Sequence, residues 1–429
     1  MRPVVFLHVG APKSGTTYLQ NVLWANREAL AEQGVLYPGA DPVDHVRAAF
    51  DLRAAFFDGD RDPRVAGAWP RLVDEIRSWS GGVSVVSQEL FGAAFPAHVR
   101  RAFADLSFAD VRLVCTARDL ARQIPAHWQE DVKNRMSLTF AEYIAGLAEP
   151  DVPRGPAWQW IREFWRTQDL PEMLRRWGAG TRVPADRVHV VTVPPAGAPP
   201  DLLFRRFCAA TGIDAARCDT EGVFGNPSLG RAETAFLRRL NEVTRARVPW
   251  AVHDDFVKHR LAQGTLVRRP GATRIRLPER FLPWTVERAE SMVAELRAAG
   301  YGVAGDLADL LPTVSGDGGS DPDQAPPEQV LDVALDSVAE LLRTLHARES
   351  ATARLEGAAG LDGLRRDVAR MRSDAEHLLT VSAPVSTVVV APVKRVVRDM
   401  SERNASVMRA RVAYWHYVER RRGRRGQER

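Results

Sequence analysis

The segment "VVFLHVGAPKSGTT", residues 4–17, decides the fold class, because a buried strand here leads directly into a glycine turn and a helix. Its apolar half lacks the strict alternation of a half-exposed strand, which is typical of a strand buried on both faces of a parallel sheet. Gly10 and Gly15 then stand at the spacing of a phosphate-binding loop. The lysine is displaced: Lys13 precedes the second glycine, and Thr16 directly follows it. The segment predicts an anion site at the end of a buried strand.

The chain up to residue 312 repeats this alternation of strand and helix. Further valine-rich runs predict strands at 83–87, 111–117 and 188–193. Apolar residues at helical spacing predict helices at 16–33, 64–79, 119–134, 158–177, 201–212, 231–247 and 284–299. We therefore expect residues 1–312 to form an α/β domain with a doubly wound parallel sheet of the P-loop-NTPase type.

The composition changes after this domain. Residues 313–327, "TVSGDGGSDPDQAPP", have no apolar spacing and predict a linker. Residues 328–429 predict an α-helical extension, in which 361–378 carry apolar residues at heptad spacing, as in a coiled coil. Residues 384–429 hold a net charge of +8 against −3 for the rest, so the chain's +5 belongs to this basic tail.

An apolar stripe beneath the arginines of the tail indicates a partner surface. Homo-oligomerisation, contact with the α/β domain and peripheral contact with an anionic membrane surface all remain open. Nucleic acid is not expected, because the arginines lack the interleaved aromatic residues of a stacking platform.

Composition and cysteine usage indicate an ordinary soluble protein. Hydrophobic residues make up 45% and charged residues 26% of the chain. Three cysteines fit neither a disulfide framework nor a zinc site. The N-terminal apolar run is used as a strand rather than as a signal peptide, and the apolar stretch 381–393 is too short to span a bilayer. We expect a cytoplasmic protein whose contact with a membrane, if any, is peripheral.

The glycine turn collects several donors at one point. The N-terminus of a helix offers free backbone N–H groups and the positive end of the helix dipole. Thr16 and Thr17 add hydroxyl groups in the first helical turn, and Lys13 adds a point charge. Gly15 lets the backbone approach a ligand closely.

Two segments carry a resemblance to a known family. "APKSGTTYLQ", 11–20, resembles the 5′-phosphosulfate loop of sulfotransferases that use 3′-phosphoadenosine 5′-phosphosulfate (PAPS). "VRLVCTARDLARQIPAHWQE", 111–130, resembles their second landmark, in which an arginine after a later strand and a serine hold the 3′-phosphate. Arg118 stands at the place of that arginine. Alanine replaces the serine at Ala126, where Gln123 or Arg122 would substitute.

The resemblance implies a PAPS-dependent sulfotransferase that needs no metal and sulfonates a hydroxyl of a carbohydrate, glycolipid or secondary metabolite. Lys13 would stabilise the charge that develops on the bridging oxygen and the sulfonyl group. Cofactor-binding residues would then be Lys13, Ser14, Gly15, Thr16, Thr17, Tyr18, Arg118 and Gln123, with Tyr18 stacked on the adenine.

In the family a carboxylate or a histidine takes the proton of the acceptor hydroxyl. Ligands of open α/β sheets bind at the carboxyl ends of strands, which favours Glu89, directly after the predicted strand 83–87. His45 is the second candidate for this base and His127 the third.

Two other functions stay open. A small-molecule P-loop kinase using ATP and Mg²⁺ would have a lysine directly after Gly15, where this chain has Thr16. A non-catalytic module, in which the helical tail mediates an interaction, is compatible with Ala126 in place of the serine.

Overall fold

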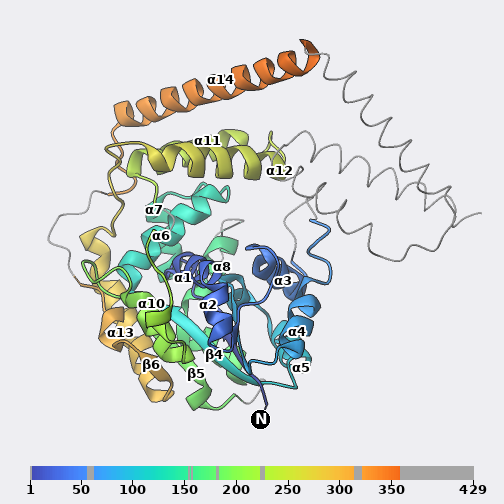
Figure 1. Cartoon of the computed structure of the whole chain (residues 1–429). Helices are drawn as coiled ribbons and strands as arrows, with labels where there is room; N and C mark the ends of the chain where they lie inside the picture. The colour runs from blue at the N-terminus through green and yellow to red at the C-terminus, as the bar shows by residue number, and fades with distance from the viewer. Residues whose placement is uncertain are drawn as a thin grey trace, which may run out of the picture. The chain divides into compact units, whose positions relative to one another are not determined.

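The computed structural model (Figure 1) describes residues 2–55, 62–152, 155, 158–179, 183–222, 228–313 and 321–357, with side chains up to residue 347. The chain divides into two compact units, Met1–Arg343 and Thr344–Arg429. The predicted heptad segment 361–378 and the basic tail 384–429 lie outside the described residues. The division into a domain, a linker and an extension therefore stays a prediction.

A six-stranded sheet forms the centre of the first unit, and every pair of neighbouring strands is parallel. Its strands, in chain order, are β1 (Val4–His8), β2 (Val35–Leu36), β3 (Val83–Ser87), β4 (Asp110–Ala117), β5 (Val188–Thr192) and β6 (Gly302–Ala304). In space the order is β2-β3-β1-β4-β5-β6. The chain thus leaves β1 toward one edge of the sheet and later continues from β1 toward the other, which confirms the predicted doubly wound α/β fold.

The described part of the chain has fourteen α-helices and several single-turn helices besides this sheet. The α-helices are α1 (Thr16–Ala25), α2 (Arg27–Glu32), α3 (Asp44–Arg53), α4 (Ala68–Ser78), α5 (Pro96–Asp105), α6 (Leu120–Lys133), α7 (Phe140–Ala148), α8 (Trp158–Gln168), α9 (Leu170–Ala179), α10 (Leu202–Thr211), α11 (Arg231–Thr244), α12 (Trp250–Val252), α13 (Leu282–Ala298) and α14 (Pro327–Gly357). A short 3-10 helix, η1 (Glu89–Ala93), follows β3, and a π-helix, η5 (His253–Thr265), follows α12.

Two hydrophobic cores lie on the two faces of the sheet. Val5 and Leu7 of β1 point into the larger core, which includes residues of α3, α4, α6 and α9. Phe6 points into the smaller core, which is built with α1, α2 and α10. Because successive side chains of a strand alternate between faces, a strand that feeds two cores must be apolar throughout. This explains the continuous apolar run that opens the chain.

Helices differ from the prediction where a side chain ends them. The helix predicted at 16–33 breaks at Asn26, whose side chain donates to the Val22 carbonyl at 2.9 Å and the Asp219 carbonyl at 2.7 Å. The helix predicted at 158–177 divides at Asp169, which accepts a hydrogen bond from the Glu172 N–H at 3.0 Å and so caps the start of α9. The short strands β2 and β6 and the helices α3, α5 and α7 were not predicted.

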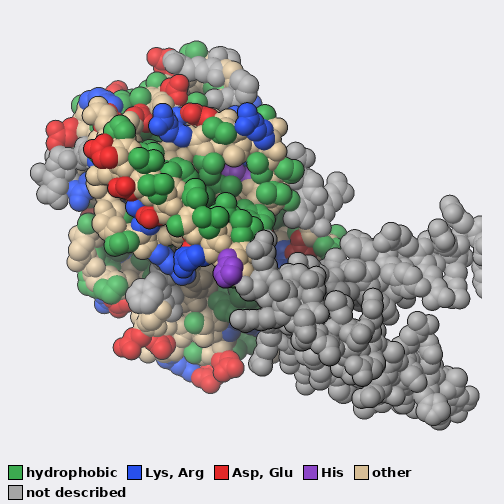
Figure 2. Space-filling model, turned by 90° about the horizontal axis from the view of Figure 1, so that it is seen from above, with side chains coloured by type: hydrophobic (Ala, Val, Ile, Leu, Met, Phe, Trp, Pro, Cys, Tyr) green, Lys and Arg blue, Asp and Glu red, His purple; other side chains and the backbone are tan. Residues whose placement is uncertain are grey.

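Helix α14 presents two different faces along its first half. On one face Val333 is fully buried, and Asp336 pairs with Arg269 of the α/β unit at 2.8 Å. The opposite face carries large apolar side chains that are 54–61% exposed, namely Leu331, Leu335, Val338 and Leu342. Figure 2 shows hydrophobic side chains gathered on the side of the molecule seen from above. Among the described helices, none is long and apolar enough to cross a membrane.

Candidate functional site

The sheet brings three predicted site segments to one edge. The loop Gly10–Thr17 follows the carboxyl end of β1, Glu89 follows β3, and Arg118 follows β4. Strands β3 and β4 are the two neighbours of β1, so the three segments leave adjacent strands. The strand order also reverses at β1, and ligands of doubly wound sheets bind in the crevice at such a switch point.

The loop backbone has the shape of an anion cradle. Lys13 and Gly15 adopt positive φ angles of 63° and 84°. Gly15 is the N-cap of α1, and no side chain caps this helix. The N–H groups of its first turn therefore have no intrahelical partner and point toward the loop. The positive φ favours glycine at this position, and a β-carbon at Gly15 would lie 2.4 Å from Leu203 Cδ2, so that side chain would have to shift.

Buried polar side chains hold the loop from below. The Ser14 hydroxyl is completely buried and donates to the Ala11 carbonyl, while Thr116 Oγ1 donates to the Gly10 carbonyl at 3.0 Å. His8 of β1 contacts Thr116 Oγ1 through Nε2 at 3.1 Å, and burial lowers its pKa to about 4. The side chain of Ser14 thus braces the loop, which leaves its backbone N–H for a ligand.

Arg118 offers a cationic group that has spare hydrogen-bonding capacity. Its Nη1 donates to the Lys13 carbonyl at 3.2 Å, which ties it to the loop. Its Nε is buried and has no hydrogen-bond partner among the described residues. Burial, reinforced by the nearby Arg122, lowers the pKa of Arg118 to about 10, and Arg274 adds a smaller effect in the same direction. Asp119 opposes this lowering, so the charge around Arg118 is mixed, and its buried Nε is the donor that remains without a partner in the described residues.

The two candidates for replacing the missing serine differ in their partners. Arg122 is occupied, because its guanidinium pairs with Asp119 and donates to the Pro194 carbonyl at 2.9 Å. Gln123 donates to the Pro12 carbonyl, and its Oε1 is buried without a partner in the part of the chain that the structure describes. Gln123 is therefore the one that lies against the loop.

The remaining predicted loop residues lie in the first turn of α1. Thr16 is buried, whereas Thr17 and Tyr18 are half-buried. The Tyr18 ring packs beside the smaller core. Burial raises the pKa of Tyr18, and Asp201 and Cys208, next to and on α10, add to this effect.

Glu89 lies beside the loop, as the prediction requires of a base. Its carboxylate accepts a hydrogen bond from Gln20 of α1 at 2.8 Å. The space beside Gly10 is bounded by the Glu89 carbonyl, 3.6 Å from where a β-carbon of Gly10 would stand. Gln20 lies one turn after Thr16 and Thr17, so its hydrogen bond holds the Glu89 carboxylate near the first turn of α1.

The two histidine candidates are engaged elsewhere. His45 is buried: its Nε2 contacts the Pro38 carbonyl at 2.8 Å, and its Nδ1 accepts from the Ser87 N–H at 3.1 Å. Burial lowers the pKa of His45. His127 contacts Asp131 at 3.2 Å within α6. These contacts favour Glu89 over both histidines as the base.

The sequence did not predict a cluster of charges in which Lys13 and Lys133 share one carboxylate. The Lys13 ammonium lies 3.1 Å from Glu130 Oε2, and Lys133 lies 3.1 Å from the same oxygen. Glu130 stands seven residues after Gln123 on α6, so both reach the loop from one helix face. The available signal was composition, because the chain contains only four lysines against 55 arginines.

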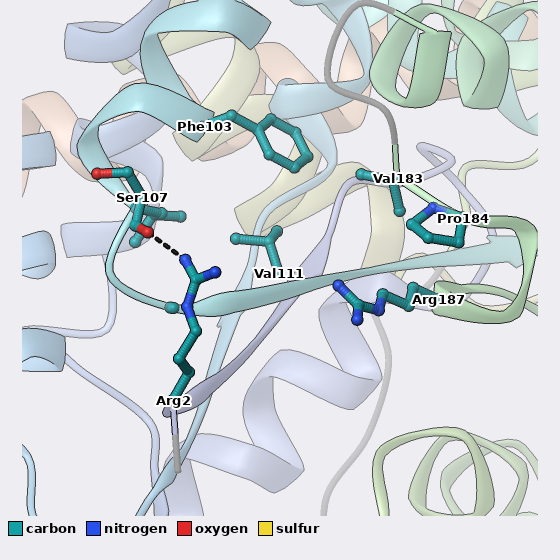
Figure 3. A pocket seen from close by; sticks show the side chains of 9 residues that line it. Arg2, Phe103, Ser107, Val111, Val183, Pro184 and Arg187 are labelled. Carbon is teal, nitrogen blue, oxygen red and sulfur yellow. Dashed lines mark hydrogen bonds between the residues drawn. The ribbon is translucent and has the colours of Figure 1, made fainter.

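A separate hollow of about 230 Å³ lies at the opposite, amino-terminal edge of the sheet (Figure 3). Arg2, before β1, and Arg187, before β5, line it together with Val111 at the start of β4. Arg2 donates to the Ser107 carbonyl, and Arg187 pairs with Asp110 at 2.5 Å. The hollow holds none of the predicted site residues.

No protein-family model matches this chain, and neither the search of curated proteins nor that of solved structures finds a match. Within the described residues, no group of three or more His, Cys, Asp or Glu side chains could hold a metal ion. The geometry of the loop and of its neighbours therefore carries the functional proposal.

Proposed function

We propose that the protein is a PAPS-dependent sulfotransferase, which moves a sulfonyl group from PAPS to a hydroxyl of an acceptor. One observation carries the proposal: Lys13, the uncapped start of α1 and the spare Nε of Arg118 meet at one edge of the sheet. Two separate cationic groups there suit a ligand with two separate anionic groups, and PAPS has them in its 5′-phosphosulfate and its 3′-phosphate.

The residues present fit such a ligand. The loop amides and α1 would hold the 5′-phosphosulfate, with the Thr16 and Thr17 hydroxyls nearby. Arg118 would hold the 3′-phosphate, because an arginine whose Nε lacks a partner gains a charge-assisted hydrogen bond when an anion arrives. Gln123 stands beside the loop where the family resemblance has its serine.

The transfer needs a base and a stabilised leaving group. As the acceptor oxygen bonds to sulfur, the bond between sulfur and the bridging oxygen breaks, and that oxygen leaves with the electron pair on the 5′-phosphate. Lys13 and the first-turn N–H groups of α1 would stabilise this charge through donors already in place. Glu89, oriented by Gln20, would accept the proton of the acceptor hydroxyl.

The acceptor is proposed as a hydroxyl-bearing small molecule or glycan, namely a carbohydrate, glycolipid or secondary metabolite. The kinase alternative keeps the same loop but expects a lysine directly after Gly15.

The cysteines Cys115, Cys208 and Cys218 are free, which supports the proposed cytoplasmic location.

A thermal-shift panel separates the proposed functions. 3′,5′-Diphosphoadenosine should raise the melting temperature, whereas ATP with Mg²⁺ should not. The opposite result would favour the kinase. No response to either ligand would favour the non-catalytic module.

The exposed face of α14 supports self-association, with a second copy of this chain as the proposed partner. Leu331, Leu335, Val338 and Leu342 are spaced four, three and four residues apart, which is the spacing of a heptad seam. A seam of this kind complements its own copy in a two-fold dimer. Size-exclusion chromatography with light scattering should find a dimer, which Leu335→Glu and Leu342→Glu together should dissociate. A monomeric unmodified protein would refute the dimer.

A further inference from the structure

Lysine is rare in this chain, and its distribution around the loop is uneven. The four lysines are Lys13, Lys133, Lys258 and Lys394, and the first three act on a single carboxylate, that of Glu130. Arginine supplies nearly all other positive charge. A lysine presents a compact point charge where arginine presents a planar fork. Two lysines in contact with one carboxylate, with a third near enough to act on it, therefore indicate a place where point charges are required.

The carboxylate of Glu130 bridges the side chains of two lysines. Glu130 Oε2 lies 3.1 Å from the Lys13 ammonium and 3.1 Å from that of Lys133. The Lys133 side chain is only 6% exposed, and its own carbonyl contacts His253 Nε2 at 2.9 Å. Lys258 approaches from η5 and is partly balanced by Asp254 at 3.9 Å. One carboxylate thus holds two ammonium groups beside the loop.

We propose that Glu130 is a positioning residue that aims Lys13 and Lys133 at one point, and that Lys133 is a second cationic contact for the transferring sulfonyl group. This inference rests on the proposed function. Two ammonium groups so close together repel each other strongly in a partly buried site. Glu130 offsets that repulsion from one side, and the sulfate group of bound PAPS, which is anionic, would contact both ammonium groups on the side away from Glu130. The pair would then stabilise the reacting group from two sides.

The same contacts make Glu130 unsuited to act as the base. Burial raises the pKa of Glu130, but Lys13, Lys133 and Lys258 together lower it well below its ordinary value. For Lys133 the balance is the reverse: burial lowers its pKa, and Glu130 opposes that effect. Loss of the Glu130 charge should therefore lower the pKa of Lys133 further, since its other neighbours Lys13 and Lys258 are also cations.

Because the chain has only four lysines, the titration of each lysine can be measured directly. Protein labelled with ¹³C at the lysine ε-carbon gives four signals, which single Lys→Arg variants assign. In Glu130→Gln the titration of Lys133 should move to lower pH by at least about one unit, because an opposite charge at this range shifts a pKa by one to three units. PAPS should move the signals of both Lys13 and Lys133 in the unmodified protein.

A second variant keeps the inference testable if Glu130→Gln does not fold. Lys133→Met should weaken binding of PAPS at least tenfold more than binding of 3′,5′-diphosphoadenosine, which lacks the sulfonyl group. Lys258→Met is the matched control and should affect both ligands alike, since Asp254 already balances that lysine. Equal losses for both ligands in Lys133→Met would overturn the sulfonyl contact.

The outcomes separate this inference from the proposed function. A Lys133 titration that Glu130→Gln leaves unchanged overturns the role of Glu130, whatever the ligand proves to be. If PAPS changes none of the lysine signals, both the proposed function and the sulfonyl contact are wrong. A PAPS response at Lys13 without one at Lys133 overturns the second contact alone.

Discussion

The two edges of the same sheet both carry arginines, yet they differ in how those arginines are used. At the carboxyl edge, Arg118 keeps a buried Nε without a partner in the described chain, next to an uncapped helix and Lys13. At the amino edge, Arg2 and Arg187 line a real hollow, but each is already bonded to a carbonyl or a carboxylate. The proposed anion site therefore rests on the combination of a spare arginine donor, an uncapped helix start and a lysine, rather than on empty volume.

This difference has a physical origin in the parallel sheet. Loops that leave adjacent carboxyl ends converge, and the helices that follow turn their N-termini toward them, so backbone N–H donors gather there. At the other edge, the arginines find main-chain oxygens and an aspartate within reach. Variants at either edge of the sheet test this difference.

The largest effect is expected from Lys13→Ala. Turnover should fall by about a hundredfold to a thousandfold, the range for losing one donor to a developing oxyanion, or roughly 2.7–4 kcal/mol. Lys13→Arg should restore only part of the rate, because a planar fork replaces a point charge. Arg187→Ala on the opposite edge is the control and should keep the normal rate. Near-normal turnover in Lys13→Ala would contradict the mechanism.

His8 under the loop should make the domain sensitive to acid. Its folded pKa of about 4 lies below the unfolded value of 6.5, so the unfolded chain binds the proton more tightly. Stability should therefore be lost as the pH falls from about 6.5 to 4, by up to about 3 kcal/mol from this group. Urea unfolding across that range should show a shallower dependence in His8→Gln. An identical dependence in both proteins would refute this role.

Arg118→Ala should weaken 3′-phosphorylated ligands selectively. Loss of one charge-assisted contact corresponds to about 1.5–3 kcal/mol in the binding of 3′,5′-diphosphoadenosine. Adenosine 5′-monophosphate, which lacks the 3′-phosphate, should lose far less in the same titration. Ala126→Ser should tighten the first ligand slightly, since it restores the hydroxyl of the resemblance. Equal losses for both ligands would remove Arg118 from the 3′-phosphate.

The smallest effect compares two glycines of nearly equal conformation. Gly15 has φ 84° with Leu203 2.4 Å from a would-be β-carbon, whereas Gly197 has φ 86° and open space around it. Gly197→Ala should cost about 1 kcal/mol of folding stability for the positive φ alone. Gly15→Ala should cost more, because Leu203 must also move. Thermal unfolding of both variants measures the difference, and equal losses would mean that Leu203 moves aside at no cost.

Sequence patterns predicted the interior of the sheet better than its margins. Strands β1, β3, β4 and β5 are apolar runs that both cores require, so the pattern alone identified them. Strands β2 and β6 contain two and three residues, too few to produce a pattern. The break at Asn26 depends on Asp219, which is distant in sequence, and no local signal encodes it.

The site shows the same division. Local segments predicted that the loop and Arg118 follow strands of the sheet, because strand, turn and helix follow one another in the chain, and the structure has them after the neighbouring strands β1 and β4. The brace of Ser14 by Thr116 and the bridge of Lys13 by Glu130 join residues more than 100 positions apart. Only folding brings such pairs together, although the scarcity of lysine was a visible sign of the second one.

Hydrogen–deuterium exchange with and without 3′,5′-diphosphoadenosine tests the central claim most directly. A ligand held by the loop amides and Arg118 should slow exchange in the peptides that contain residues 10–19 and 116–124. The peptides that line the amino-edge hollow, around Ser107 and Arg187, should exchange at an unchanged rate. Protection confined to the hollow, or absent from the loop at a saturating ligand concentration, would contradict the account.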